Sequence, residues 1–255
     1  MKTPSGFTLV EMAIVLVIVG LLLGGLLMPL SAQIEQRRIS ETQKTLEEIR
    51  EALIGYAASH TSSPHNRPYL PCPDITLPTP PFTPNDGIED RYPLLPLTAN
   101  SGRCVSQEGN IPWATLGVSR TDSWYNRVRY RVDSNFSGQG DNQILTTTDG
   151  FQLTNAGALR VCTDNTCAAT VATQIPAVIL SHGKNGYGAI NNANLLNPAP
   201  PAADVSELEN ANGNNNFVSG TPTPAGSAMG EFDDIVSWLS PNILYNRMVA
   251  AGRLP

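Results

Sequence analysis

The first sixty residues show two hydrophobic patterns in succession. Residues 12–30 contain no charged side chain, and a run of this length is sufficient for a helix to cross a bilayer. In residues 31–60 the apolar positions instead recur every three, four or seven residues, which predicts an amphipathic helix. That stripe comprises Ile39, Leu46, Ile49, Leu53 and Tyr56. We predict one long helix, with a membrane-spanning part at 7–30 and an amphipathic part at 31–60.

The pattern changes after His60 into short strand-like runs between long loops. Residues 61–100 are too rich in proline for regular structure, and residues 191–230, rich in Asn, Pro, Ala and Gly, are interpreted as an insertion or linker loop. Alternating or continuous apolar residues predict strands elsewhere. These lie around Trp113 and in the segments NRVRYRVD, ALRVC and PAVILS.

The C-terminal segment SPNILYNRMVAAGRLP predicts a short final helix. Ser240 suits the N-cap, Pro241 the first helical position and Gly252 the stop. Together these patterns predict an α+β fold, in which a long N-terminal helix packs on an antiparallel sheet with long loops. Residues 61–255 would form one globular domain.

Charge and hydropathy predict where the chain lies. The formal net charge of -6 and the pI near 5.0 argue against nucleic acid as a partner, because such binding needs a basic face. Lys2 is the basic residue that precedes the apolar run, which places the N-terminus in the cytoplasm and the domain outside it. We therefore expect a single-pass inner-membrane protein with a periplasmic or extracellular domain.

Four cysteines would then lie in an oxidising compartment, where an even number favours disulfides over a metal site. In CTDNTC, four residues separate Cys162 from Cys167, which suits a hairpin closed by a disulfide. Cys72 and Cys104 would then close the proline-rich loop. This pairing is favoured among the three possible connectivities, and a metal site remains the alternative.

The segment GFTLVE near the start places one acid, Glu11, beside the apolar run. A carboxylate inside a membrane costs about 3 kcal/mol even on lenient scales, so it normally has a partner. With its short leader and the helix that follows, the segment resembles the N-terminal signature of type IV pilins and of type II secretion pseudopilins. A secretory signal cut after PLSA, before Gln33, and a plain membrane anchor are the alternatives.

The resemblance implies how the N-terminus is processed. Residues 1–6 would be a leader, a prepilin peptidase would cut between Gly6 and Phe7, and the new amino group of Phe7 would be methylated. Glu11 would neutralise this cationic end on a neighbouring subunit. The implied partners are other pilin or pseudopilin subunits, the prepilin peptidase and methyltransferase, and an inner-membrane assembly platform.

Three later segments are similar in order to elements of the major type II secretion pseudopilin: DSWYNRVRYRV, LSHGKNGYG and EFDDIVSW. In that subfamily the last acidic segment contributes to a calcium site, which makes Asp233 and Asp234 candidate ligands. Calcium takes carboxylate and carbonyl oxygens. The insertion at 191–230 departs from the family pattern, and the alternative is that both acids cap a turn or helix before Ile235.

Other motifs give weaker signals. Asp86, Glu89 and Asp90 in NDGIED are a second candidate for calcium, although their spacing is too short for an EF-hand, and a solvated turn explains them too. GKNG lacks the features of a phosphate-binding Walker loop. Because Ser181 and His182 are neighbours on a strand, they point to opposite faces and make a poor catalytic pair.

The sequence thus predicts a structural protein rather than an enzyme, with calcium as the one candidate cofactor. It would be a minor pilin or pseudopilin of a type IV pilus or type II secretion filament. The alternative is a membrane-anchored extracytoplasmic enzyme or binding module with a pilin-like anchor, which would need a concave site after His60.

Overall fold

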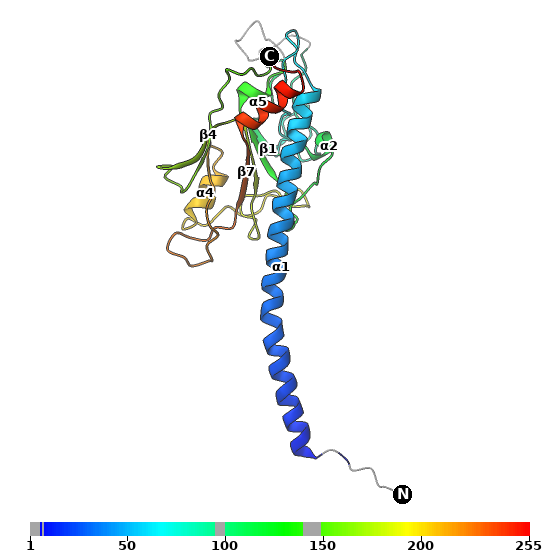
Figure 1. Cartoon of the computed structure of the whole chain (residues 1–255), viewed down its shortest axis with the longest axis vertical. Helices are drawn as coiled ribbons and strands as arrows, with labels where there is room; N and C mark the ends of the chain where they lie inside the picture. The colour runs from blue at the N-terminus through cyan, green and yellow to red at the C-terminus, as the bar shows by residue number, and fades with distance from the viewer. Residues whose placement is uncertain (1–5, 7, 95–99, 140–148) are drawn as a thin grey trace. The chain divides into compact units, whose positions relative to one another are not determined.

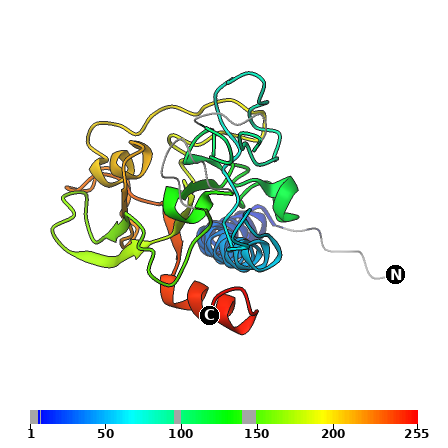
Figure 2. The same cartoon turned by 90° about the horizontal axis from the view of Figure 1, so that it is seen from above.

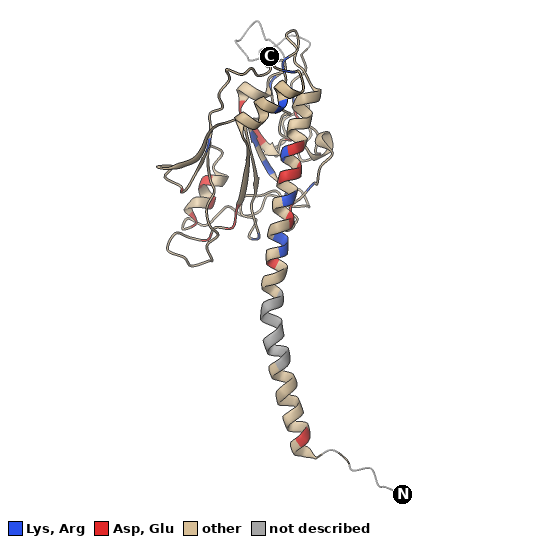
Figure 3. Ribbon diagram, in the orientation of Figure 1, with Lys and Arg blue, Asp and Glu red and all other residues tan. Residues whose placement is uncertain are grey.

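The computed structural model describes residues 6, 8–94, 100–139 and 149–255, and the backbone but not the side chains of 22–30. The longest element is α1, Leu9–Ser59 (Figure 1). The chain divides into two compact units, residues 1–41 and 42–255, so that α1 contributes to both. Figure 3 shows acidic and basic residues interspersed along the second half of α1, where ion pairs four residues apart such as Lys44 with Glu48 stabilise an exposed helix face.

The second unit contains a four-stranded antiparallel sheet in the order β1-β2-β5-β7. Its strands are β1 (Glu108–Asn110), β2 (Arg129–Val132), β5 (Ala177–Ser181) and β7 (Ile235–Leu239). All five residues of β5 are buried, as expected of a central strand. In the register of the sheet, Ser181 lies opposite Ile235, so the segment that follows β5 lies beside the segment that precedes β7.

A second sheet of three strands has the order β4-β3-β6. Strand β3 (Leu159–Cys162) pairs antiparallel with β4 (Thr170–Ile175) and parallel with β6 (Asn216–Val218). The connection from β3 to β4 contains Cys167, which is bonded to Cys162. The short helix α4 (Val205–Ala211) precedes β6.

The core of this unit has two parts, one on each face of the four-stranded sheet. Alternate residues of β5 point to opposite faces, so Ile179 joins the side chains of α1 and α5 (Pro241–Ala250), whereas Val178 packs against the three-stranded sheet. Seen from above in Figure 2, α5 and the strands of the second sheet lie on different sides of the unit. The main contributions from α1 and α5 are Leu46, Ile49, Leu53, Leu244 and Met248, all at most 2% exposed.

The α+β class, with an N-terminal helix and an antiparallel sheet, is confirmed. Two local expectations were wrong. The segment around Trp113 is not a strand but the one-turn helix α2 (Trp113–Leu116), which begins after Pro112 and ends where Gly117 adopts a φ of 68°. The insertion at 191–230 contains α4 and β6, because the side chain of Asn210 forms two hydrogen bonds with the backbone of Val218.

Within the described part of the chain, no helix is both long and apolar enough to cross a membrane. The side chains of 22–30, which belong to the expected membrane-spanning part at 7–30, lie outside the described residues.

Two short helices adjoin the first sheet. Helix α3 (Ser134–Ser137) follows β2, and the side chain of Asp133 caps it by accepting a hydrogen bond from the backbone N–H of Asn135 at 2.8 Å. Helix α5 begins at Pro241, with Ser240 in extended conformation at the N-cap position. Its buried residues Leu244 and Met248 are four apart and therefore lie on one helix face.

Candidate processing motif and metal centre

Three hydrogen bonds between Thr8 and Glu11, donated in both directions, stabilise the start of α1. The backbone N–H and the hydroxyl of Thr8 each donate to Oε2 of Glu11 at 2.9 Å, and the N–H of Glu11 donates to Oγ1 of Thr8 at 3.3 Å. This is a capping box, which satisfies N–H groups that a helix start leaves unpaired. Glu11 therefore has a local role that the pattern Thr-x-x-Glu already contained and that our sequence interpretation missed.

Gly6 and Phe7 flank the expected cleavage site of the processing motif. Gly6 is exposed, and a side chain at this position would contact nothing within 4 Å. Phe7, the expected new N-terminus, lies outside the described residues. The exposure of Gly6 is compatible with a peptidase acting next to it.

The apolar side chains on either side of Glu11, from Leu9 to Leu21, have little contact within the described chain. Most are at least half exposed, and burying an apolar side chain of this size in an apolar environment is worth about 1.5 to 3 kcal/mol. The most exposed are Leu9 at 87%, Leu21 at 72%, Val10 at 67% and Leu16 at 67%. A continuous exposed apolar surface of this kind is typical of a segment that is covered by lipid or by other subunits.

Three acidic side chains meet in the second unit, and each uses one carboxylate oxygen to hold itself in place. Oε1 of Glu207 accepts from the side-chain amide of Asn185 at 2.7 Å and from the N–H of Asp233 at 3.1 Å. Oδ2 of Asp234 accepts from the side-chain amide of Asn210 at 2.8 Å. These bonds orient the carboxylates without using their second oxygens.

Asp233 is held in the same way by the turn that follows β5. Its Oδ2 accepts from the N–H groups of Lys184 and Asn185 at 3.1 and 3.0 Å. The turn needs a glycine at position 183, where φ is +56° and a Cβ would collide with Asp233. The Gly-rich turn after β5 and the acidic segment before β7 therefore form one structure.

The second oxygens of the three carboxylates have no hydrogen-bond partner. These are Oε2 of Glu207, Oδ1 of Asp233 and Oδ1 of Asp234, and one oxygen from each residue lies within 4.8 Å of the others. Glu207 and Asp234 are only 1% and 5% exposed. Unpaired buried oxygens are costly, and these three acids could hold a metal ion between them. Oδ1 of Asp234 also lies 3.5 Å from Nδ1 of His182.

Burial also raises the pKa of these acids, to about 8 for Glu207 and about 7 for Asp233, with repulsion from Asp234 adding to both shifts. A bound cation would oppose both effects. The donors are all carboxylate oxygens on loops and a short helix, which suits calcium. The residues present therefore fit the metal that the sequence resemblance implied.

Asp233 and Asp234 were candidate ligands from the sequence, whereas Glu207 was not. Glu207 lies in α4, inside the segment expected to be an insertion or linker loop. The segment DVSELEN contained a signal, since an acid and an amide three residues apart lie on one helix face. The structure brings this insertion back to the acidic segment through Asn210.

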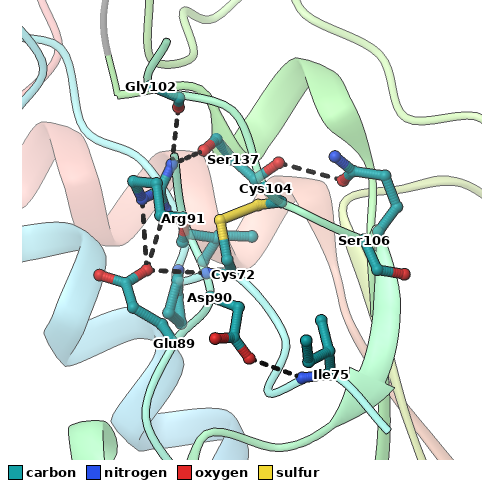
Figure 4. The surroundings of a disulfide bond; sticks show 12 residues. Cys72, Ile75, Glu89, Asp90, Arg91, Gly102, Cys104, Ser106 and Ser137 are labelled. Atoms are coloured by element: carbon teal, nitrogen blue, oxygen red, sulfur yellow. Dashed lines mark hydrogen bonds and ion pairs between the residues drawn. A yellow bond between two sulfur atoms is a disulfide. The ribbon is translucent and has the colours of Figure 1, made fainter. Parts of the chain in front are cut away.

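The second acidic group, Asp86, Glu89 and Asp90, is arranged differently, and Figure 4 shows Glu89 and Asp90 with their partners. Glu89 forms an ion pair with Arg91 at 3.1 Å and accepts the N–H of Cys72 at 2.9 Å. Asp90 accepts the N–H of Ile75 at 2.8 Å, and Asp86 accepts that of Ile88 at 2.9 Å. Each of these acids thus has at least one oxygen engaged by the protein, and among the described residues they are not part of the acidic group whose ligand atoms lie within 4.8 Å of one another. Calcium at this turn stays a prediction.

The four cysteines form two pairs in the structure. Cys72 is bonded to Cys104, with a Cα–Cα distance of 5.2 Å, and Cys162 to Cys167, with a Cα–Cα distance of 5.0 Å. The first links the proline-rich segment to the residues that precede β1, and the second closes the β3–β4 connection. Both distances are within the usual range for disulfides.

Comparison with known protein families gives one match. Residues 1–27 match the family described as the prokaryotic N-terminal methylation motif, which is the signature of type IV pilins and pseudopilins. Comparison with curated proteins and with solved structures gives no match. The chain thus carries a pilin-type N-terminus, and the resemblance inferred from GFTLVE is confirmed.

The N-terminal methylation motif has implications for the class of protein, its processing and its location. Proteins with this motif are structural subunits rather than enzymes. The motif implies processing by a prepilin peptidase and assembly with other pilin subunits, and it suggests a membrane-anchored precursor that later enters a filament.

Proposed function

We propose that this chain is a minor pilin or pseudopilin, a structural subunit of a type IV pilus or type II secretion filament. The observation that carries the proposal is the N-terminal methylation motif at residues 1–27. The exposed apolar side chains between Leu9 and Leu21 support it, because they need either lipid or neighbouring helices. The inner membrane is the site of assembly, and the second unit lies in the periplasm or outside the cell.

In this proposal Gly6 marks the cut and Phe7 becomes the methylated N-terminus. Glu11 then has two roles in succession. It caps α1 through Thr8 within its own chain, and it offers a carboxylate to the cationic N-terminus of a neighbouring subunit in the filament. The second role is favourable because both charges are costly in lipid unless they are paired.

The processing step can be tested by the intact mass of the protein from cells with and without prepilin peptidase. We expect a chain that starts at Phe7 and carries one added methyl group in the first case, and an uncut leader in the second. A chain that starts at Met1 or Gln33 in peptidase-containing cells would contradict the filament proposal. A Gln33 start would instead identify a secretory signal.

The assembly role of Glu11 can be separated from its capping role by two substitutions. Glu11→Gln retains the oxygen that accepts from Thr8 but removes the charge, whereas Thr8→Val weakens the cap and retains the charge. We expect Glu11→Gln to lose most incorporation into filaments sheared from cells, and Thr8→Val to retain it. Equal incorporation of Glu11→Gln and the native chain would show that the acid acts only as a cap.

We further propose that Glu207, Asp233 and Asp234 hold a calcium ion. The cation would supply positive charge between the three unpaired oxygens, and the residues themselves would fasten α4 to the β5 turn and to the start of β7. Full-length protein in detergent should therefore unfold at a higher temperature in calcium than in a chelator. Identical unfolding temperatures in both would contradict the site.

A further inference from the structure

Arg127 is a buried arginine without an acidic partner. It lies just before β2, its exposed fraction is 1%, and it has no ion pair with any residue of the described ranges. Its Nη2 donates to Oδ1 of Asn194 at 2.5 Å, but Nε and Nη1 have no hydrogen-bond partner. A buried guanidinium with unmet donors is unfavourable unless something else in the protein or a ligand satisfies them.

The ring of Trp113 accounts for part of this burial. The guanidinium carbon lies 4.1 Å from the centre of the Trp113 ring, a favourable cation–π distance. Desolvation lowers the pKa of Arg127 to about 10, with repulsion from Arg120 lowering it further and attraction by Asp74 opposing the shift. At neutral pH Arg127 is therefore still a cation. In the described part of the chain, no group accepts a hydrogen bond from its Nε or Nη1.

Arg127 lines a cavity of about 460 Å³ in the second unit. This volume lies in the range of sites for small organic molecules and is too large for a bare inorganic ion. The wall of the cavity contains both polar and apolar residues. The apolar part comprises Ala189, Ile190, Leu196, Ala199, Pro200 and Ala211.

The charged wall of the cavity is positive overall. Arg129 lines it beside Glu108, and the same glutamate also forms an ion pair with Arg131. One carboxylate is thus shared by two arginines, while Arg127 has none. His182 also lines the cavity, and its Nδ1 lies 3.5 Å from Oδ1 of Asp234. The cavity therefore presents a surplus of cationic donors together with an apolar wall.

We propose that this cavity binds a small organic carboxylate: an acid whose charged group meets Arg127 and whose short apolar body fills the space lined by Ile190 and Leu196. A carboxylate oxygen would accept the N–H donors that Arg127 leaves unpaired. The apolar wall disfavours an inorganic anion, which would leave that wall uncovered. This binding function is distinct from filament assembly and does not depend on the proposed metal centre.

The test measures binding to full-length protein in detergent by isothermal titration calorimetry. The probes are 4-methylpentanoate, the neutral 4-methylpentanol of the same shape, and inorganic phosphate. We expect saturable one-to-one binding of the acid, at least about tenfold tighter than binding of the alcohol or of phosphate. Equal binding of acid and alcohol, or no saturation by the acid up to about 10 mM, would overturn the proposal. Preferential binding of phosphate would overturn the assigned ligand class.

Arg127→Met removes the charge and retains much of the side-chain length. We expect it to weaken binding of the acid at least about tenfold and to leave binding of the alcohol unchanged. Arg120→Met is the matched control, because Arg120 also lies over the Trp113 ring, at 5.9 Å, but does not line the cavity. Equal effects of the two substitutions would contradict a specific role of Arg127.

A second pair of variants keeps the test valid if Arg127→Met does not fold. Leu196 lines the cavity, yet 70% of its surface is exposed, so polar substitutions there are tolerated by the fold. Leu196→Glu places a competing carboxylate at the cavity, and Leu196→Gln is its neutral match. We expect the Glu variant to bind the acid at least about tenfold more weakly than the Gln variant does, with equal binding of the alcohol. Equal binding of the acid by both variants would contradict the proposal.

Discussion

The acids of the loop at 86–90 and the acids around Glu207 are similar in number but differ in how their oxygens are arranged. In the loop, Glu89 and Asp90 accept hydrogen bonds from backbone groups, and Glu89 also pairs with Arg91. Around Glu207, each carboxylate uses one oxygen for the protein and leaves the other without a partner. In the loop, Glu89 thus has a cation from the protein itself, whereas the group around Glu207 leaves buried oxygens where we propose a calcium ion.

The difference shows that the number of acids close together in sequence is a poor guide to metal binding. What distinguishes the two regions is the cationic side chain of Arg91, which pairs with Glu89 in the loop. Arg91 donates to Glu89 and to the backbone carbonyls of Gly102 and Leu70, which makes it the centre of the loop. No cationic side chain is among the hydrogen-bond donors to Glu207 or Asp233 in the described part of the chain.

The largest expected effect concerns Asp74, a wholly buried acid beside the loop, whose Oδ2 accepts from the N–H of Gly87. Burial raises the pKa of Asp74 from 3.8 to about 7. Because the folded state holds the proton more tightly, stability is highest below pH 4 and falls as the pH rises through 7. Relative to Asp74→Asn, the native chain should lose up to about 4 kcal/mol of unfolding free energy between pH 4 and pH 8.

Chemical denaturation across this pH range measures the difference between the two proteins. Acids elsewhere with raised pKa values, such as Glu207, are present in both proteins and cancel in the comparison. A difference that stays constant with pH would show that Asp74 is already ionised at low pH and would remove this account of its burial.

Glu89→Gln should have the next largest effect. It leaves Arg91, whose side chain is 6% exposed, without its anion, and breaking a buried ion pair costs about 3 kcal/mol. Glu48→Gln is the matched control: Glu48 pairs with Lys44 on the exposed face of α1, where such pairs contribute about 0.5 kcal/mol or less. Thermal unfolding of the native chain, Glu89→Gln and Glu48→Gln measures this difference. Equal stability of the two variants would contradict a structural role of Glu89.

What could be predicted from sequence depended on whether the signal was local. The α1 helix, the buried strand β5 and the β3 strand ending at Cys162 follow from periodicity within a few residues. The one-turn helix at Trp113 did not, because its end depends on the left-handed conformation of Gly117. The role of Glu207 depends on Asn210, which connects α4 to Val218 and Asp234 through contacts no local pattern contains.

Glu207→Gln is expected to act only through the cation. At a calcium concentration about 100 times the dissociation constant, bound calcium stabilises the native chain by about 2.7 kcal/mol, and the variant should lose about that amount. In a chelator at pH 7 the variant should be about as stable as the native chain, because a Glu207 carboxyl with a pKa of about 8 is then mostly protonated and neutral, as Gln is. Glu209→Gln is the control on the same helix, since Glu209 accepts only from Asn212 and Asn214. Equal loss in chelator and calcium would show that Glu207 is a structural acid, as Glu89 is.

The smallest expected effect concerns Asp86, the exposed member of the loop group. Its Oδ1 accepts the N–H of Ile88 at 2.9 Å, a local turn bond that Asn can also form. Asp86→Asn should therefore change the unfolding free energy by less than about 0.5 kcal/mol, in calcium and in chelator alike. Differential scanning calorimetry in both conditions measures this. A calcium-dependent change would restore the loop as a cation site, because in that case a charge that the fold does not need would be serving a metal.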